Sequence, residues 1–125
     1  MNSLPPKKTG IKSLVRSFSC AFDGILLVVR GQRNVRIHLT FTLLVIIAGY
    51  AFGISAGEWC IIFLAIGLVL AMEALNTAVE KLVDFVSPEF HAKAGEVKDI
   101  AAGGVLITAI AAILVGLVIF IPKII

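Results

Sequence analysis

Five polar side chains at the end of an apolar stretch are the residues of this sequence best suited to chemistry. The stretch WCIIFLAIGLVLAM (59–72) carries no charge and runs into EALNTAVEKLVD (73–84). At about 100° per residue, the polar side chains of 73–84 share roughly one quarter to one third of a helix circumference. They are Glu73, Asn76, Thr77, Glu80 and Asp84. An ionised group inside a bilayer costs a few kcal/mol or more, so such a face is expected to line a helix bundle and to act in function.

Glu73 and Glu80 could divide the work of one reaction between them. On a helix they stand two turns apart, roughly 10 Å, which is far for one metal ion to bridge. One carboxylate could then hold Mg²⁺ while the other takes a proton. The deeper and less solvated Glu73 suits the base, and Glu80, nearer the surface, could meet a soluble metal complex.

Further polar residues converge on the same side of the chain from the flanking segments. They are Asn34, Arg36 and His38 before the first long apolar segment, and Glu89, His91, Lys98 and Asp99 before or at the start of the last. Carboxylates for a hard cation, with lysine and arginine for phosphate oxygens, are the groups that phosphoryl transfer needs. For the two histidines, a solvated or helix-capping role is the usual interpretation, ahead of metal ligation.

A nucleotide site in this chain would not be a P-loop, because the sequence contains no GxxxxGK[ST] motif. The small tetrad AAGG (101–104) has no lysine after it. We expect it to let neighbouring helices pack closely.

Composition indicates a membrane protein. Hydrophobic residues make up 59% of the 125 residues and charged residues only 15%, against about 25% in soluble domains. The mean hydropathy is +1.05. This length allows one domain and no separate catalytic module. The net charge of +3 is interpreted as anchoring to anionic lipid headgroups, and nothing points to nucleic acid.

The pattern predicts an all-α membrane protein with an amphipathic surface helix and three spanning helices. Residues 1–8 are predicted to be disordered, and 9–125 to form a single membrane-embedded domain. Between about 9 and 30, apolar residues recur at helical spacing, which predicts a helix in the membrane interface. The spans are expected at about 39–56, 59–86 and 99–121, each near the ~20 residues that cross a bilayer. The short join around Gly57 and Glu58 makes the first two an antiparallel hairpin.

Lysine and arginine predict the orientation of these spans. Of the 11 positive residues, only Lys123 lies at the far end of the last span. The others precede the first span or lie near the loop 87–98. By the positive-inside rule, the N-terminus and this loop are expected to be cytoplasmic.

Three stretches closely resemble the prokaryotic diacylglycerol kinase family, which includes the undecaprenol kinases. They are RNVRIH (33–38), EALNTAVEKLVD (73–84) and PEFHAKAGEVKDIAAGGVLI (88–107). The resemblance covers the chain from about residue 12. It implies a homotrimer in the bacterial cytoplasmic (inner) membrane, with active sites shared between subunits. It also implies phosphorylation of a lipid alcohol, undecaprenol or diacylglycerol, by ATP with Mg²⁺ at the cytoplasmic face.

The resemblance implies roles for individual residues. Glu73 is similar to the family's general base, which acts on the lipid hydroxyl, and Asn76 to its polar neighbour in the active site. Glu80 matches a metal-binding glutamate. The residues expected at the nucleotide are Glu89, His91, Lys98, Asp99 and Arg16, and those expected at the lipid substrate, besides Glu73, are Asn34 and Arg36.

Two departures from the family pattern leave a weakened or inactive enzyme as an alternative. Gln32 stands where the family usually has a metal-binding glutamate; its amide oxygen can coordinate Mg²⁺ but carries one negative charge fewer. Ser13 stands where an arginine is common, and Lys12 or Arg16 could substitute for it. The AAG after Lys98-Asp99 (101–103) resembles the undecaprenol kinase branch, but the sequence does not choose the lipid.

A small multidrug or proton-coupled transporter is a further alternative, because such proteins also use a glutamate within the membrane. A transporter would place the acid near mid-span and would usually have a fourth helix. Here Glu73 lies off-centre in its span and three spans are expected. The sequence therefore favours the lipid kinase.

Overall fold

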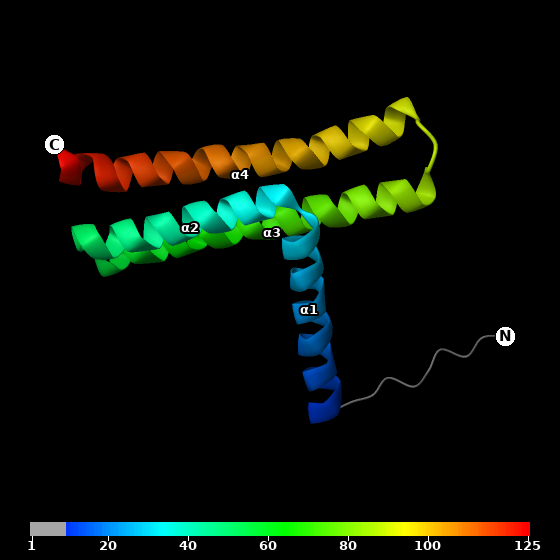
Figure 1. Ribbon diagram of the computed structural model, residues 1–125, viewed down its shortest axis with the longest axis horizontal. Coiled ribbons are helices and arrows are strands. Elements are labelled where there is room, and N and C mark those ends of the chain that lie inside the picture. Colours follow the sequence, from blue (N-terminus) through cyan, green and yellow to red (C-terminus); the bar gives the residue numbers. More distant parts are fainter. Residues whose placement is uncertain (1–9) are drawn as a thin grey trace.

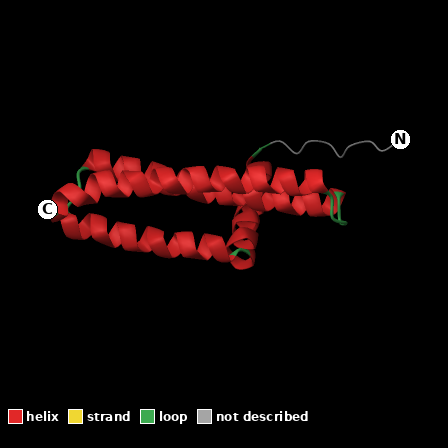
Figure 2. Ribbon diagram, turned by 90° about the horizontal axis from the view of Figure 1, so that it is seen from above, coloured by secondary structure: helices red, strands yellow, loops and turns green. Residues whose placement is uncertain are grey.

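Helices form nearly all of the chain that the structure describes, residues 10–125 of a computed structural model. They are α1 (Ile11–Gly31), α2 (Arg33–Phe52), α3 (Ala56–Val86) and α4 (Ala92–Ile124). Figure 2 shows that the loops are short and lie between successive helices and directly before α1. By length and composition α2, α3 and α4 can each cross a membrane, which confirms the predicted all-α architecture with three spans. The segment 1–8, predicted to be disordered, lies outside the described residues.

The three apolar helices run alongside one another, and α1 leaves them crosswise (Figure 1). The most extensive helix contact is between α3 and α4, while α2 packs mainly on α3. With 31 and 33 residues, α3 and α4 are much longer than the 20-residue α2. They therefore continue past the corner where α1 meets α2 (Figure 1). This corner marks a position along the bundle axis. Beyond that position α3 and α4 extend as a pair, without α2.

The end of α2 is encoded by a glycine. Gly53 takes the left-handed conformation, with φ 62° and ψ 50°, which a glycine adopts without steric cost. The amide of Gly53 donates to the carbonyl of Tyr50 at 3.3 Å, and that of Ile54 to Gly49 at 3.2 Å. These two bonds are a Schellman motif and satisfy carbonyl groups that the helix leaves unpaired at its end.

A capping box starts α3 directly after this turn. The hydroxyl of Ser55 accepts from the amide of Glu58 at 3.2 Å, and the Glu58 carboxylate accepts from the amide of Ser55 at 3.0 Å. The hairpin predicted between the first two spans is present, but its turn is Gly53–Ser55 and not the predicted join at Gly57 and Glu58. Both of those residues belong to the first turn of α3, because the serine–glutamate pair fixes the helix start ahead of them.

Each spanning helix begins before its predicted apolar segment. Helix α2 begins at Arg33 where the span was expected from about 39, and α4 begins at Ala92 where it was expected from about 99. The polar residues of these first turns are helical because backbone hydrogen bonds require no apolar side chains. An apolar run marks the depth of the hydrocarbon core and not the length of the helix that crosses it.

The far end of the bundle is closed by an ion pair and an aromatic cluster. Lys123 lies 3.2 Å from the carboxylate of Glu58, which joins the end of α4 to the start of α3. Beside this pair in sequence, the Trp59 ring has its centroid 5.1 Å from that of Tyr50 and 5.4 Å from that of Phe63. The α2–α3 hairpin and the last turn of α4 are therefore fixed to each other.

Two glycines mark close approaches between helices. A Cβ added at Gly49 would lie 2.6 Å from Cη2 of Trp59, and one at Gly104 would lie 2.8 Å from Cε of Met72. Nothing lies within 4 Å of such an atom at Gly103. Of the two glycines in the tetrad 101–104, Gly104 thus meets the expectation of close packing within one chain.

We expect Gly49→Ala to destabilise the fold by about 1–3 kcal/mol, because the rigid indole of Trp59 leaves no room for a methyl group. Gly104→Ala is expected to lower the stability less, since the added methyl group meets only the flexible end of the Met72 side chain. Gly67→Ala is the matched control, because the space around Gly67 is open. Thermal unfolding in detergent measures all three. Equal midpoints for the Gly49 and Gly67 variants would contradict the predicted clash.

Candidate active site

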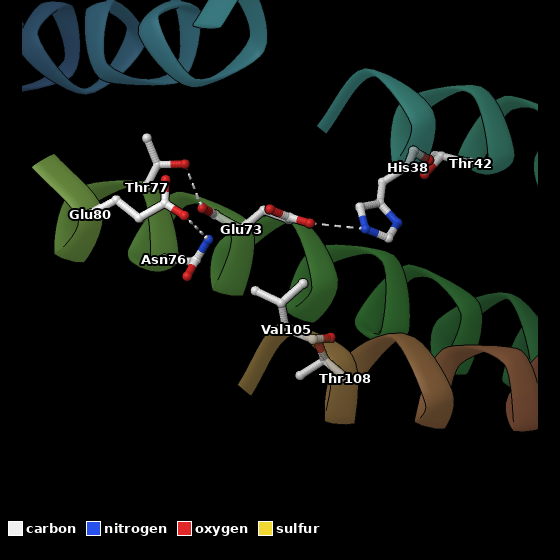
Figure 3. A network of polar contacts seen from close by, with 8 residues as sticks. All are labelled: His38, Thr42, Glu73, Asn76, Thr77, Glu80, Val105 and Thr108. Atoms are coloured by element: carbon white, nitrogen blue, oxygen red, sulfur yellow. Dashed lines mark hydrogen bonds and ion pairs between the residues drawn. The ribbon is translucent and has the colours of Figure 1, made fainter. Parts of the chain in front are cut away.

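A buried carboxylate lies at the level of the α1–α2 corner. The side chain of Glu73 on α3 is 4% exposed, and its Oε1 lies 3.0 Å from Nε2 of His38 on α2 (Figure 3). His38 is 26% exposed and lies less than two turns after the start of α2. Since a buried carboxylate is costly unless it is paired or hydrogen-bonded, this contact is the partner that the position requires.

The polar stripe of α3 divides into a buried pair and a half-buried pair. Glu73 and Thr77 are buried, and the Thr77 hydroxyl donates to the backbone carbonyl of Glu73 at 2.9 Å. Asn76 and Glu80 are half-buried, and Nδ2 of Asn76 donates to Oε1 of Glu80 at 3.3 Å (Figure 3). The helical period predicted this shared face.

The amide oxygen of Asn76 is an acceptor that could receive a hydrogen bond or a cation from a ligand. Among residues 10–125, it is the buried side-chain oxygen that lacks a hydrogen-bond partner. Leaving such an acceptor unsatisfied costs about 1–3 kcal/mol. Asn76 Oδ1 and the Glu80 carboxylate are hard oxygen donors one turn apart, but Nδ2 is the amide atom that faces Glu80, so both oxygens would reach one Mg²⁺ only with the amide turned over. Proteins usually hold Mg²⁺ by one or two carboxylates together with substrate phosphates and water.

No cluster of three or more histidine, cysteine or acidic residues that could hold a metal occurs within the described part of the chain. The Asn76–Glu80 pair is therefore a partial site. It suits a cation that arrives already bound to phosphate oxygens.

An ion pair joins α3 and α4 one turn beyond Glu80. Nζ of Lys98 lies against Oδ1 of Asp84, with the two side chains 37% and 66% exposed. A pair this exposed adds at most about 1 kcal/mol of stability. Its effect is positional, because it holds a lysine at the solvent end of the polar stripe. The neighbouring Asp99 is exposed at the same level.

The residues before the first span gather at the corner between α1 and α2. Gln32 is the non-helical residue between α1 and α2, and its backbone is extended, with φ −120° and ψ 115°. Nη1 of Arg36 donates to the carbonyl of Arg30 at 3.2 Å, so Arg36 caps the end of α1. Asn34 is exposed. Of the two residues expected at the lipid substrate besides Glu73, Arg36 thus has a structural contact and Asn34 is open to a ligand.

The loop between α3 and α4 holds two of the residues expected at the nucleotide. The carbonyl of Glu89 accepts from the Ser87 hydroxyl at 3.2 Å, and its side chain is exposed. Nδ1 of His91 accepts from the amide of Lys93 at 3.1 Å, so His91 caps the start of α4. For His91 the capping interpretation is confirmed.

Arg16, also expected at the nucleotide, lies far along α1. It precedes Gln32 by 16 residues, roughly 24 Å of helix. Figure 1 shows α1 extending away from the other three helices. One chain therefore does not bring Arg16 to the polar stripe of α3.

An apolar cavity begins at His38, the partner of the buried carboxylate. It has a volume of about 290 Å³ and lies between α2, α3 and α4. His38 lies at its polar end, and the rest of its wall is almost wholly apolar, with Phe41, Val45, Ile62 and Ala112 among the lining residues. It extends from the level of the corner toward the aromatic end of the bundle. Its apolar lining suits a hydrocarbon chain.

His38 is the site residue whose contact the sequence did not predict. It was interpreted as a solvated or capping histidine, and the structure instead pairs it with Glu73. The spacing of residues around His38 in the sequence did indicate that it faces the bundle. Val35, His38, Thr42 and Val45 follow one helical face, and all four are buried or half-buried. That face points His38 into the bundle.

Three spanning helices surround a buried carboxylate. An apolar cavity lies on one side of it and polar side chains lie on the other. This arrangement defines a small membrane-embedded enzyme. The family model described as prokaryotic diacylglycerol kinase matches residues 19–120. The chain is 41% identical over 108 residues to the undecaprenol kinase of Bacillus subtilis (strain 168), covering 86% of this chain and 88% of that protein.

Two diacylglycerol kinases are also similar. The one from Synechocystis sp. is 39% identical over 111 residues, covering 88% of this chain and 63% of that protein. The one from Escherichia coli (strain K12) is 24% identical over 106 residues, covering 85% of this chain and 87% of that protein. The chain belongs to the prokaryotic diacylglycerol kinase family. This confirms the resemblance and the lipid kinase class, and it disfavours the transporter alternative.

Proposed function

We propose that this protein transfers the γ-phosphoryl group of ATP to the hydroxyl of a membrane lipid alcohol, undecaprenol or diacylglycerol, at the cytoplasmic face. The buried Glu73, held by His38 at the level where α1 leaves the bundle, is the observation that carries the proposal. On one side of it lies an apolar cavity, and on the other the polar groups of α3 and α4. A lipid hydroxyl and a water-soluble nucleotide could meet only at such a boundary.

Glu73 acts as the general base in this proposal. It takes the proton of the lipid hydroxyl as that oxygen bonds to the γ-phosphorus, and the bond from phosphorus to the bridging oxygen breaks to release ADP. Positioned acid–base groups of this kind contribute about 10²- to 10⁴-fold to a rate. The partial burial of the site strengthens each charge interaction around the transferring group.

The remaining polar residues hold the nucleotide and the metal. Glu80 supplies a carboxylate ligand for the metal, with Gln32 as a further amide ligand from the corner, and Asn76 is the polar neighbour of Glu73 and Glu80 in the active site. Mg²⁺, when bound with ATP, neutralises charge on the β- and γ-phosphates. We assign the phosphates and nucleotide to Lys98, Asp99, Glu89, His91 and Arg16, and the lipid headgroup to Asn34 and Arg36.

We place α1 in the membrane interface on the cytoplasmic side of the inner membrane. Its large apolar side chains are exposed in the single chain, among them Leu14, Phe18, Phe22 and Ile25. Buried in lipid at the interface, they would hold α1 crosswise to the spans. The positively charged residues near the corner and near the α3–α4 loop support a cytoplasmic location for both.

We propose a homotrimer in which neighbouring subunits share each active site. The position of Arg16, roughly 24 Å of helix from the corner of its own chain, supports this, because a neighbouring polar stripe is a place where it could act. Native mass spectrometry of the detergent-solubilised protein tests the assembly. A mass of three chains is expected, and a monomer that is active would contradict shared sites.

Transfer of radiolabelled phosphate from ATP tests the function. Purified protein receives Mg²⁺ with undecaprenol or diacylglycerol side by side, and the label in the extracted lipid is measured. We expect label in at least one lipid, dependent on both Mg²⁺ and the alcohol. The preferred lipid is the one labelled with the higher kcat/KM. No label in either lipid would leave the inactive alternative in place.

Gln32→Glu tests the metal role of the corner residue. We expect the Mg²⁺ concentration for half-maximal rate to fall about five-fold, because one added negative charge near the cation is worth roughly 1 kcal/mol in a solvated site. Gln32→Ala is expected to raise it. A Mg²⁺ titration of the initial rate measures both variants. Identical titration curves for all three proteins would show that residue 32 does not contact the metal.

A further inference from the structure

The assignments above rest on the contact between His38 and Glu73 but give His38 itself no role in the reaction. It joins two helices, with Nε2 of His38 3.0 Å from Oε1 of Glu73. The backbone carbonyl of His38 accepts from the Thr42 hydroxyl at 2.8 Å, and α2 packs on α3 around this level. A side chain held on a packed helix places its polar atom more reproducibly than one on a loop.

Within the described residues, the other polar groups near Glu73 have different partners. The Thr77 hydroxyl donates to the backbone carbonyl of Glu73 at 2.9 Å and not to its carboxylate. Nδ2 of Asn76 donates to Glu80 at 3.3 Å. The contact that the Glu73 carboxylate makes is with His38. The orientation of this carboxylate therefore depends on one imidazole.

We propose that His38 is the positioning residue for the base of the reaction. Its Nε2–H donates to Oε1 of Glu73, which leaves Oε2 free to take the proton of the lipid hydroxyl. This inference rests on the proposed function, because it assigns a role within that site. A base displaced by about 1 Å loses on the order of 10²-fold in rate, so holding the carboxylate in one orientation has a large effect.

The place of His38 in the cavity supports the same role. Its side chain lines the polar end of the apolar cavity as well as contacting Glu73. A hydrocarbon chain lying in this cavity would bring its hydroxyl past the imidazole to the carboxylate. His38 thereby sets both the orientation of the base and the side from which the hydroxyl reaches it.

Three substitutions separate positioning from packing. His38→Gln puts an amide nitrogen near the place of Nε2, His38→Asn stops near the place of Nδ1, and His38→Ala removes both. We expect the Ala and Asn variants to lower kcat by about 10- to 100-fold with KM for ATP unchanged. The Gln variant is expected to stay within about three-fold of wild type, because it restores a donor to Glu73.

Thr40→Val is the control on the same helix, since the Thr40 hydroxyl donates to its own helix at Arg36, at 3.0 Å, and is exposed. Its kcat is expected to match wild type. A second readout is the activity of the double variant that carries both His38→Ala and Glu73→Gln. If His38 acts through Glu73, the double variant loses no more activity than Glu73→Gln alone.

Equal rates for the Gln and Asn variants, or an unchanged kcat in His38→Ala, would overturn the positioning role. The positioning role would also be overturned if kcat fell in step with the thermal unfolding midpoint across all three variants. In each of these outcomes wild type still transfers phosphate, and the proposed function stands. Absence of transfer by wild type itself would overturn the proposed function and this inference with it.

Discussion

Glu73→Gln is expected to lower kcat by about 10²- to 10⁴-fold while assembly and ATP binding survive. Glutamine has the same size as glutamate and can still accept from His38, but it cannot take the proton of the lipid hydroxyl. The residues assigned to metal and phosphate begin a turn further along α3, at Asn76 and Glu80, and are unchanged.

Three measurements on this variant separate catalysis from structure. The initial rate gives kcat, the binding of a labelled ATP analogue gives its dissociation constant, and thermal unfolding with native mass gives the state of the fold. Glu96→Gln is the matched control, because Glu96 is exposed on α4 and has no assigned role. Loss of assembly in Glu73→Gln would point to a structural role for the carboxylate and contradict its assignment as the base.

Glu80→Gln is expected to raise the Mg²⁺ concentration for half-maximal rate by about 10- to 100-fold, equivalent to roughly 1.4–2.8 kcal/mol. The substitution removes a formal negative charge from a hard-cation ligand. It also leaves Asn76 beside an amide in place of a carboxylate, which weakens the hydrogen bond now 3.3 Å long.

A Mg²⁺ titration at saturating ATP distinguishes this effect from the loss of the base. High Mg²⁺ restores a large part of kcat in Glu80→Gln, because the defect is in binding. It restores none in Glu73→Gln, where the defect is in proton transfer. An unchanged Mg²⁺ dependence in Glu80→Gln would show that the metal lies elsewhere, and Glu96→Gln again serves as the control.

The sequence predicted the features that depend on one helix at a time. Apolar runs predicted three spanning helices, and the 100° period placed Glu73 and Thr77 on one face of α3, where both are buried. Burial of an acidic side chain off-centre in an apolar helix is unusual enough to indicate function. These features could be predicted because helix period and hydropathy are properties of consecutive residues.

Features that depend on two helices could not be predicted in this way. The contact of His38 with Glu73 requires the register of α2 against α3, and that register is set by the Gly53–Ser55 turn and by the packing of Trp59 on Gly49. The predicted turn was displaced by three to four residues toward α3. Such a displacement alone is enough to hide which residue of α2 faces Glu73.

The outer part of the candidate site remains a prediction for a different reason. Lys98 lies at the end of the polar stripe through its contact with Asp84, but Arg16 is remote from that stripe in its own chain. A site shared between subunits depends on contacts between chains, which neither a pattern along one chain nor the fold of one chain contains. The proposed trimer is what would bring Arg16 to a neighbouring stripe.

A single-turnover experiment tests the central claim most directly. Wild-type protein in excess over radiolabelled ATP is mixed with lipid alcohol and Mg²⁺, and the label is followed in ATP, protein, free phosphate and lipid. We predict that label passes directly from ATP to the lipid, without labelled protein, and that in Glu73→Gln it stays on bound ATP. Label on the protein, or release only as free phosphate, would contradict a lipid kinase in which Glu73 serves as the base.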